Sequence, residues 1–160
     1  MGLDIHLSAL GDWVPDFVRI SNRMAGIMRD PTPVEISAHR GLLAANALRV
    51  ENLEIFVHHV AEGARVREDT APNEDAPSAA ELKADLATIV LAAQKQVTSP
   101  QRLHRIYTML SPFTDGNGRC GRALLMWQVM RASERPNRKQ ASMRGVSSQP
   151  RSRSAHSVLM

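Results

Sequence analysis

The sequence predicts an all-α fold with a basic C-terminal tail. Apolar residues recur every three or four positions through most of residues 1–130, and helix-capping patterns precede several of these stretches. Strand-like alternation is confined to residues 64–67. A chain of 160 residues buries roughly 70% of its unfolded surface, which suits one domain with a hydrophobic core.

Three helices are predicted in the first part of the chain. One runs from Trp13 to Met28, and a second from Pro33 to about Asn46, because Thr32 suits the N-cap and Pro33 the first helical position. A third runs from about Val50 to Glu62. The expected core positions of the first and third helices are Trp13, Phe17, Ile20, Met24 and Ile27, and Leu53, Phe56, Val57 and Val60.

A polar interruption follows, and three further helices are predicted over residues 79–96, residues 100–110 and the stretch after Gly118. Ser78 and Ser99 are the expected N-caps of the first two. The last helix is apolar almost all round, which is typical of a central helix. The expected core positions of the other two are Leu82, Leu86, Ile89 and Val90, and Leu103, Ile106, Tyr107 and Leu110.

The net charge of +4 is unevenly distributed along the chain. Residues 1–130 hold 13 Lys and Arg against 15 Asp and Glu, a net of −2, whereas residues 131–160 hold seven basic residues against one acid, a net of +6. The second segment is rich in Ser and Arg and lacks an apolar period, so we expect a disordered tail after a helical domain of residues 1–130. Because the excess basic charge lies outside the folded domain, nucleic acid is not an expected partner.

The sequence favours a cytoplasmic protein. No apolar run approaches the roughly 20 residues that a membrane span needs, and the N-terminus lacks the basic region and apolar stretch of a signal peptide. The single cysteine, Cys120, excludes an internal disulfide and is compatible with a reducing compartment. No membrane partner is therefore expected.

The segment from Ser111 to Arg122 is the one stretch whose residue types point to chemistry. Gly116 and Gly118 flank Asn117, and glycines at this spacing let successive backbone N–H groups turn toward one point and form an anion nest. The helix that starts directly afterwards adds unpaired N–H groups and the positive end of its dipole. This combination predicts a phosphate site.

Charged side chains beside the nest fit a polyphosphate with a metal ion. Arg119 and Arg122 lie three positions apart, on one face of the first helical turns, and each can hold phosphate oxygens in a bidentate manner. Asp115 supplies the hard oxygen ligand that Mg²⁺ prefers. A hairpin turn is a poorer explanation because the flanks are helical, and an EF-hand calcium loop would need more carboxylates. Taken alone, the two arginines also suit an ordinary helix surface.

The same segment resembles the signature of the Fic family, H-P-F-x-D-G-N-G-R-x-x-R. Eight of the nine specified positions are present, from Pro112 to Arg122, and the resemblance covers roughly residues 30–130. It implies a Fic/Fido-type helical bundle with a short β-hairpin flap, within residues 63–77, that docks the backbone of a target protein. Family members usually transfer AMP from Mg-ATP to a Ser, Thr or Tyr hydroxyl of another protein and release pyrophosphate.

The resemblance also implies a role for each matching position, with Mg²⁺ as cofactor and ATP as co-substrate. The implied ligands are Asp115 for Mg²⁺, Gly116, Asn117 and Gly118 for the α- and β-phosphates, and Arg119 and Arg122 for the outer phosphates. The implied catalytic positions are Ser111, Asn117 and Arg119.

The general base of the signature is missing. Family members place a histidine where this chain has Ser111. Imidazole titrates near pH 7 and accepts a hydroxyl proton, whereas a serine hydroxyl is far too weak a base, and base catalysis is worth about 10²–10⁴-fold. His104 lies seven residues earlier, about 10 Å along a helix axis, which is too far for direct proton abstraction. We therefore expect protein adenylylation to be weak or absent.

Two alternatives stay open from the sequence. An active nucleotidyltransferase would use water, the substrate or another base in place of the missing imidazole, and a pseudoenzyme would bind nucleotide or a partner and act by interaction alone. The family's inhibitory motif, [ST]-x-x-x-E-[GN], has no match, so we expect no built-in autoinhibition. An antitoxin protein is a further partner that the resemblance leaves open.

Overall fold

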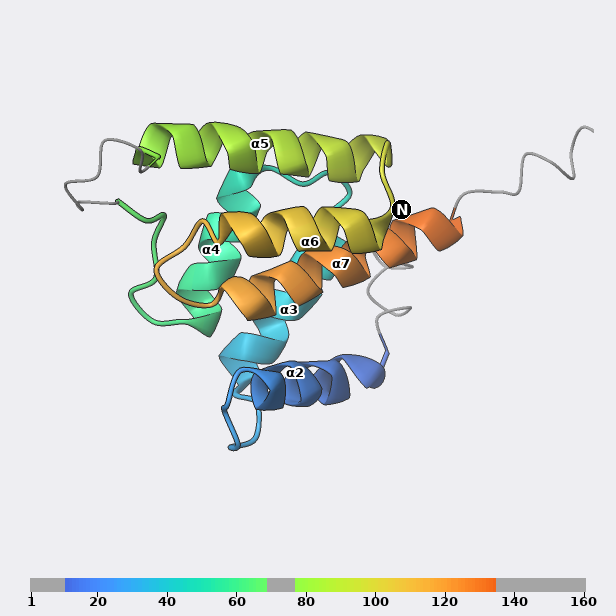
Figure 1. The fold of residues 1–160 in the computed structure, drawn as a ribbon. Coiled ribbons are helices and arrows are strands. Elements are labelled where there is room, and N and C mark those ends of the chain that lie inside the picture. Colours follow the sequence, from blue (N-terminus) through green and yellow to red (C-terminus); the bar gives the residue numbers. More distant parts are fainter. Residues whose placement is uncertain (1–10, 69–76, 135–160) are drawn as a thin grey trace, which may run out of the picture.

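The structure, a computed structural model of the chain, describes residues 11–68 and 77–134. Most of them form the helices of Figure 1: α2 (Trp13–Met24), α3 (Pro33–Ala44), α4 (Val50–Val60), α5 (Ala79–Lys95), α6 (Pro100–Leu110) and α7 (Asn117–Glu134). The predicted all-α class is confirmed, because the β-type pairing in these residues is limited to an isolated bridge between Val66 and Phe113. None of the described helices is long and apolar enough to cross a membrane.

The α7 helix lies at the centre of the bundle, as the sequence predicts. It packs against α2, α3, α4 and α6, while α5 packs against α4 and α6 (Figure 1). Its buried residues are Arg119, Cys120, Gly121, Ala123, Leu124, Trp127 and Gln128. The helix that follows the predicted phosphate site is therefore also the helix around which the domain is built.

Side-chain caps start three helices where the sequence predicts them. Thr32 Oγ1 accepts a hydrogen bond from the Glu35 amide (3.2 Å), and Glu35 Oε2 accepts one from the Thr32 amide (2.7 Å). Ser78 and Glu81 form the same reciprocal pair at α5, and Ser99 caps the first turn of α6. Each cap satisfies helix N–H groups that have no partner within the helix.

The predicted core positions of α4 and α5 are confirmed. The buried set includes Leu53, Phe56, Val57 and Val60 of α4, and Leu82, Leu86, Ile89 and Val90 of α5. The prediction is wrong at one position of α6, because Ile106 is 43% exposed while Leu103 and Tyr107 are buried. The α6 helix packs against both α5 and α7, and Ile106 is left on its solvent-exposed side.

The predicted core face of α2 is correct at the start of the helix, where Trp13 packs against the core and Phe17 against the buried His39, and wrong at its end. Ile20 and Met24 are 59% and 68% exposed. The residues that α2 buries are Val14, Val18, Ser21 and Asn22. This mixed face points inward because Ser21 and Asn22 hydrogen-bond to charged side chains of α7 and α3. A pattern built on hydrophobicity counts such residues as outward-facing and so misplaces the inward face in the second half of the helix.

The α2 helix also ends four residues earlier than predicted, at Met24. The Ile27 amide donates to the Asn22 carbonyl (2.9 Å), and the Gly26 amide donates to the Arg23 carbonyl (3.0 Å). These are the two hydrogen bonds of a Schellman motif, and Gly26 has the left-handed φ of 79° that the motif requires. The glycine therefore ends the helix despite the apolar residues that follow it.

The α7 helix continues to Glu134, four residues beyond the predicted end of the helical domain. Arg131 Nη2 donates to the Ala45 carbonyl (2.6 Å), which also accepts from the Trp127 indole N–H (2.8 Å). The Arg131 guanidinium lies 5.5 Å from the centre of the Trp127 ring. The predicted start of the tail thus falls inside α7, and residues 135–160 lie outside the described part of the chain.

Candidate functional site

The signature loop, residues 111–116, joins α6 to α7 and contains two left-handed residues. Ser111 follows α6 with a φ of 43°, and Gly116 precedes α7 with a φ of 75°. Glycine is needed at the second position for space as well, since a Cβ there would lie 3.1 Å from the Cβ of Ala61. The loop therefore runs close against the residue that follows α4.

The side chain of Asn117 holds the signature loop closed. Its Oδ1 accepts from the Phe113 amide (2.9 Å), and its Nδ2 donates to the Phe113 carbonyl (2.7 Å). The Phe113 ring is buried, so this pair of hydrogen bonds joins the loop to the core. Both polar atoms of the Asn117 side chain are thus engaged, and its backbone N–H is the group that remains for a ligand.

Residues 64–67 support the loop from the side. Val66 forms the antiparallel bridge with Phe113, and backbone hydrogen bonds of 2.9 Å flank the pair. Arg67 Nε donates to the Ser111 carbonyl (2.6 Å). The predicted strand-like stretch therefore pairs with the signature loop, whereas residues 69–76, which would complete the flap, lie outside the described residues. The β-hairpin stays a prediction.

Ser111 directs its hydroxyl back toward α6 and not across the loop. Its Oγ donates to the Thr108 carbonyl (2.7 Å). His104, the nearest histidine along the chain, lies with Nδ1 3.0 Å from the Gly121 carbonyl and packs on α7. Neither residue is placed as a substitute for the histidine of the signature.

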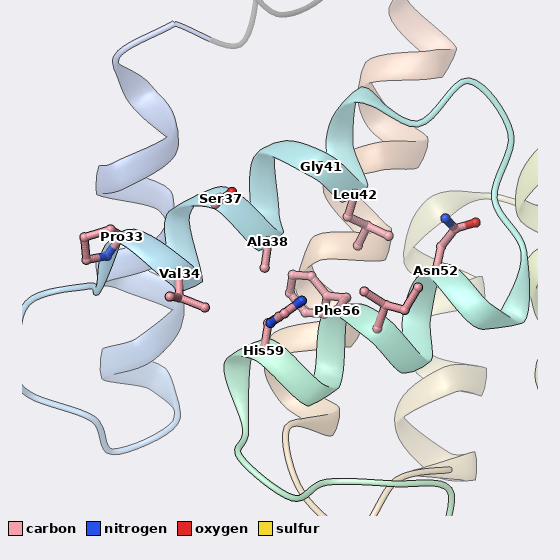
Figure 2. Close-up of a pocket in the computed structure, with 10 residues that line it drawn as sticks. Pro33, Val34, Ser37, Ala38, Gly41, Leu42, Asn52, Phe56 and His59 are labelled. Carbon is pink, nitrogen blue, oxygen red and sulfur yellow. The ribbon is translucent and has the colours of Figure 1, made fainter.

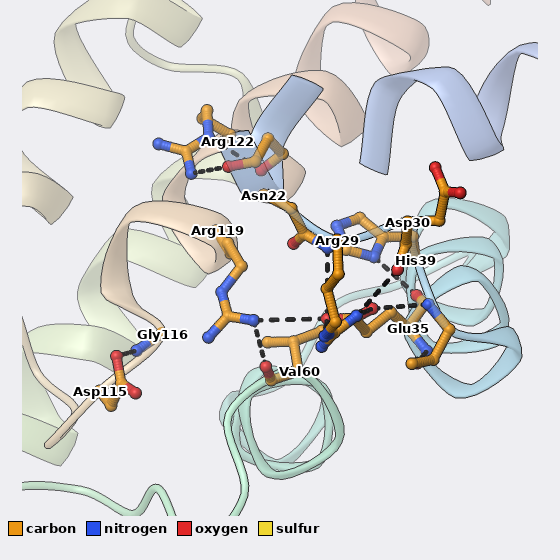
Figure 3. Close-up of polar contacts among 12 residues, drawn as sticks. Asn22, Arg29, Asp30, Glu35, His39, Val60, Asp115, Gly116, Arg119 and Arg122 are labelled. Atoms are coloured by element: carbon orange, nitrogen blue, oxygen red, sulfur yellow. Dashed lines mark hydrogen bonds and ion pairs between the residues drawn. The ribbon is translucent and has the colours of Figure 1, made fainter. Parts of the chain in front are cut away.

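Asp115 is exposed at the end of the loop, and its Oδ1 accepts a hydrogen bond from the Gly116 amide (Figure 3). Mg²⁺ is usually held by one or two carboxylates together with phosphate oxygens and water. One exposed carboxylate beside an anion nest fits that chemistry. In residues 11–68 and 77–134, no group of three or more His, Cys, Asp or Glu side chains is arranged to hold a metal alone.

The first turn of α7 presents backbone amides next to the loop. The first amide that bonds within the helix is that of Cys120, which donates to the Gly116 carbonyl (2.9 Å). The amides of Asn117, Gly118 and Arg119 precede it and have no carbonyl partner within α7. These groups and the helix dipole are the features on which the predicted anion nest depends.

Arg119 lies beneath the loop, in the interior. Its residue surface is 5% exposed, its Nη1 donates to the Val60 carbonyl, and the same nitrogen lies 3.6 Å from Glu35 Oε1 (Figure 3). Its Nε is buried without a hydrogen-bond partner among the described residues. The guanidinium that the resemblance assigns to outer phosphates is therefore turned toward α3 and α4 in this structure.

Glu35 is the centre of a buried polar cluster that the sequence does not reveal. Its carboxylate accepts from Asn22 Nδ2 (3.3 Å) and from both terminal nitrogens of Arg29 (2.8 and 3.0 Å). Burial alone raises the pKa of Glu35, but the hydrogen bonds from Arg29 and from the Thr32 amide outweigh it and lower the pKa to about 2. The one sequence signal at Glu35 is its place in the capping box, which is a local role.

His39 is a core residue above this cluster, in line with the structural role that its sequence context suggests. Its ring packs edge-on against Phe17 and Phe56, and its Nδ1 lies 2.7 Å from the Glu35 carbonyl. Burial lowers the pKa of His39, and the charges of Arg119 and Arg122 lower it further, against an opposing effect of Glu35. The ring is therefore neutral at pH 7.

Arg122 turns to a different helix from Arg119. Its Nε and Nη2 both donate to Ser21 of α2. Burial lowers the pKa of Arg122, and the neighbouring charge of Arg119 lowers it further. The two arginines predicted to act on one face are thus close enough to interact but are held by separate elements, and no sequence signal marks Ser21.

A groove away from the signature loop is present on the described residues. It has a volume of 620 Å³ and lies between α3 and α4, with Val34, Leu42, Ile55 and Phe56 among its lining residues (Figure 2). No residue of the predicted phosphate site contributes to it.

Comparison of the chain with protein families, with curated proteins and with solved structures gives no match. The resemblance to the Fic family therefore depends on the residues of the sequence alone.

Proposed function

We propose that this chain is a Fic-like protein that binds Mg-ATP at the signature loop and adenylylates protein hydroxyl groups weakly or not at all. The observation that carries the proposal is the form of the loop at the N-terminus of α7. Gly116 reverses the chain at a φ of 75°, and Asn117 fixes the loop through Phe113. The first-turn amides of α7 are left next to an exposed carboxylate, that of Asp115.

The proposal gives each element of the site a separate task. The amides of Gly118 and Arg119 and the guanidinium of Arg122 offset phosphate charge. Asp115 holds Mg²⁺, which supplies charge neutralisation at the bridging phosphate oxygens when it is bound. A target protein docks at the segment within residues 63–77, where residues 64–67 already pair with the loop.

Ser111 limits the chemistry that such a site performs. Its hydroxyl proton is donated to Thr108, and the group has no basicity near pH 7 with which to accept a proton from a substrate. This observation favours a second candidate function, a pseudoenzyme that binds nucleotide or a protein partner such as an antitoxin. The two candidates share the nucleotide site and differ in whether AMP is transferred.

Isothermal titration calorimetry with Mg-ATP tests the shared part of the proposal. We expect binding to the unaltered chain and a loss of affinity of about tenfold in Asp115→Asn, because the metal ion loses its protein ligand. Asp85→Asn, which alters an exposed carboxylate on α5, is the matched control and should bind as the unaltered chain does. Absence of binding to the unaltered chain would contradict the proposal.

A further inference from the structure

Ser21 makes the contact that orients Arg122. It lies on the inward face of α2 and is 1% exposed. Arg122 Nε donates to Ser21 Oγ (2.9 Å), and Arg122 Nη2 donates to the Ser21 carbonyl (2.8 Å). Two parallel hydrogen bonds to one residue fix the plane of a guanidinium, because its donors form a rigid fork.

The third nitrogen of this guanidinium lies beside Gly118, one of the residues of the predicted phosphate site. A Cβ on Gly118 would lie 3.2 Å from Arg122 Nη1, so the group lies directly against the first turn of α7. In the described part of the chain, Nη1 has no hydrogen-bond partner, whereas Nε and Nη2 have Ser21. The glycine of the signature leaves the space that Nη1 needs to lie beside the first turn of α7.

The two arginines differ in the charge of the group that holds them. Arg119 is 3.6 Å from the carboxylate of Glu35, which offsets its positive charge in the interior. Arg122 is held by a hydroxyl and a carbonyl, which are neutral, so its orientation is fixed while its charge stays available to an anion.

We propose that Ser21 is a positioning residue that holds Arg122 Nη1 beside the first turn of α7 for the outer phosphates of a nucleoside triphosphate. This inference rests on the proposed function, and it extends the site to α2, which lies before the region covered by the family resemblance. It predicts a specific difference between two ligands. Loss of the Ser21 hydroxyl weakens binding of a ligand with outer phosphates and leaves binding of AMP, which lacks them, unchanged.

The test compares the affinities of Mg-ATP and AMP for Ser21→Ala by calorimetry. We expect the Mg-ATP affinity to fall about tenfold and the AMP affinity to stay within about twofold, because one charge-assisted hydrogen bond to Arg122 is lost. Ser21→Thr keeps the hydroxyl and should restore the Mg-ATP affinity. Ser37→Ala, at an exposed serine of α3, is the control for the substitution itself.

Thermal unfolding of each variant shows whether the fold is retained. If Ser21→Ala is unfolded, Ser21→Cys replaces it, since a thiol has nearly the size of the hydroxyl but is a weak acceptor. An unchanged Mg-ATP affinity, or an equal fall for Mg-ATP and AMP, would overturn the role of Ser21 while leaving nucleotide binding intact. Failure of the unaltered chain to bind either ligand overturns the proposed function and this inference together.

Discussion

The carboxylate of Glu35 illustrates how much of this molecule is decided by single buried residues. It receives hydrogen bonds from α2, from the segment before α3 and from its own helix cap, and it is the charged neighbour of Arg119. A buried charge is tolerated only when such partners replace the water that it loses. The position of Arg119 beneath the loop therefore depends on the ionised form of Glu35.

Glu35→Gln should make the stability of the domain less sensitive to acid. The pKa of Glu35 is lowered from 4.5 to about 2, so the ionised carboxylate contributes about 3 kcal/mol of stability above pH 4.5. That contribution is lost as the pH falls from about 4.5 toward 2, because the unfolded state binds the proton first. Urea unfolding at a series of pH values measures it, and the variant should be less stable at pH 7 and should lose less stability than the unaltered chain across this window.

Glu81→Gln is the matched control, since Glu81 occupies the same position of a capping box but is exposed. It should change the acid dependence far less. His39 adds a loss of stability as the pH falls below 6.5, because its lowered pKa makes the unfolded state the better proton acceptor there. An unchanged acid dependence in Glu35→Gln would show that its carboxylate is not held as described.

At the scale of the helices, the site depends on how closely α6 and α7 approach each other. Gly121 permits this approach, because a Cβ there would lie 2.9 Å from Tyr107 Cδ1 and 3.2 Å from His104 Cε1. Tyr107 is fully buried and has no free space into which its ring can move. The signature loop spans the ends of these two helices, so their spacing sets its shape.

Gly121→Ala is expected to destabilise the domain by about 1–3 kcal/mol through this overlap, despite the higher helix propensity of alanine. Gly41→Ala is the control, since Gly41 lies in α3 with no atom within 4 Å of an added Cβ. That change should stabilise the domain by up to about 1 kcal/mol. Melting temperatures of the two variants should shift in opposite directions, and equal shifts would contradict the packing argument.

The helices themselves were predictable where their signals are local. The caps at Thr32, Ser78 and Ser99 each involve residues within one turn, and all three are confirmed. The inward face at the end of α2 was not predictable, because Ser21 and Asn22 are buried by partners on other helices. The end of α7 was not predictable for the same reason, because its last turn is held by a hydrogen bond from Arg131 to the distant Ala45 carbonyl.

For the molecule as a whole, the sequence locates the candidate site but not the residues that support it. The signature positions are contiguous and therefore visible, from Ser111 to Arg122. Their partners are remote: Ser21 is 101 positions from Arg122, and Val60 is 59 positions from Arg119. Neither pair of residues is close enough in the sequence to form a motif that predicts the contact. Residues 1–130 carry a net charge of −2. An attraction for phosphate therefore depends on where these two arginines lie and not on the overall charge of the domain.

The measurement that tests the account most directly is labelling of protein substrates from α-³²P-ATP by the unaltered chain and by Ser111→His. Histidine is among the residues that tolerate the left-handed conformation found at this position, so the loop should accept it. The account predicts that the imidazole raises AMP incorporation by about 10²–10⁴-fold, while Ser37→His, at an exposed serine of α3, has no effect. Equal labelling by the unaltered chain and by Ser111→His would contradict it.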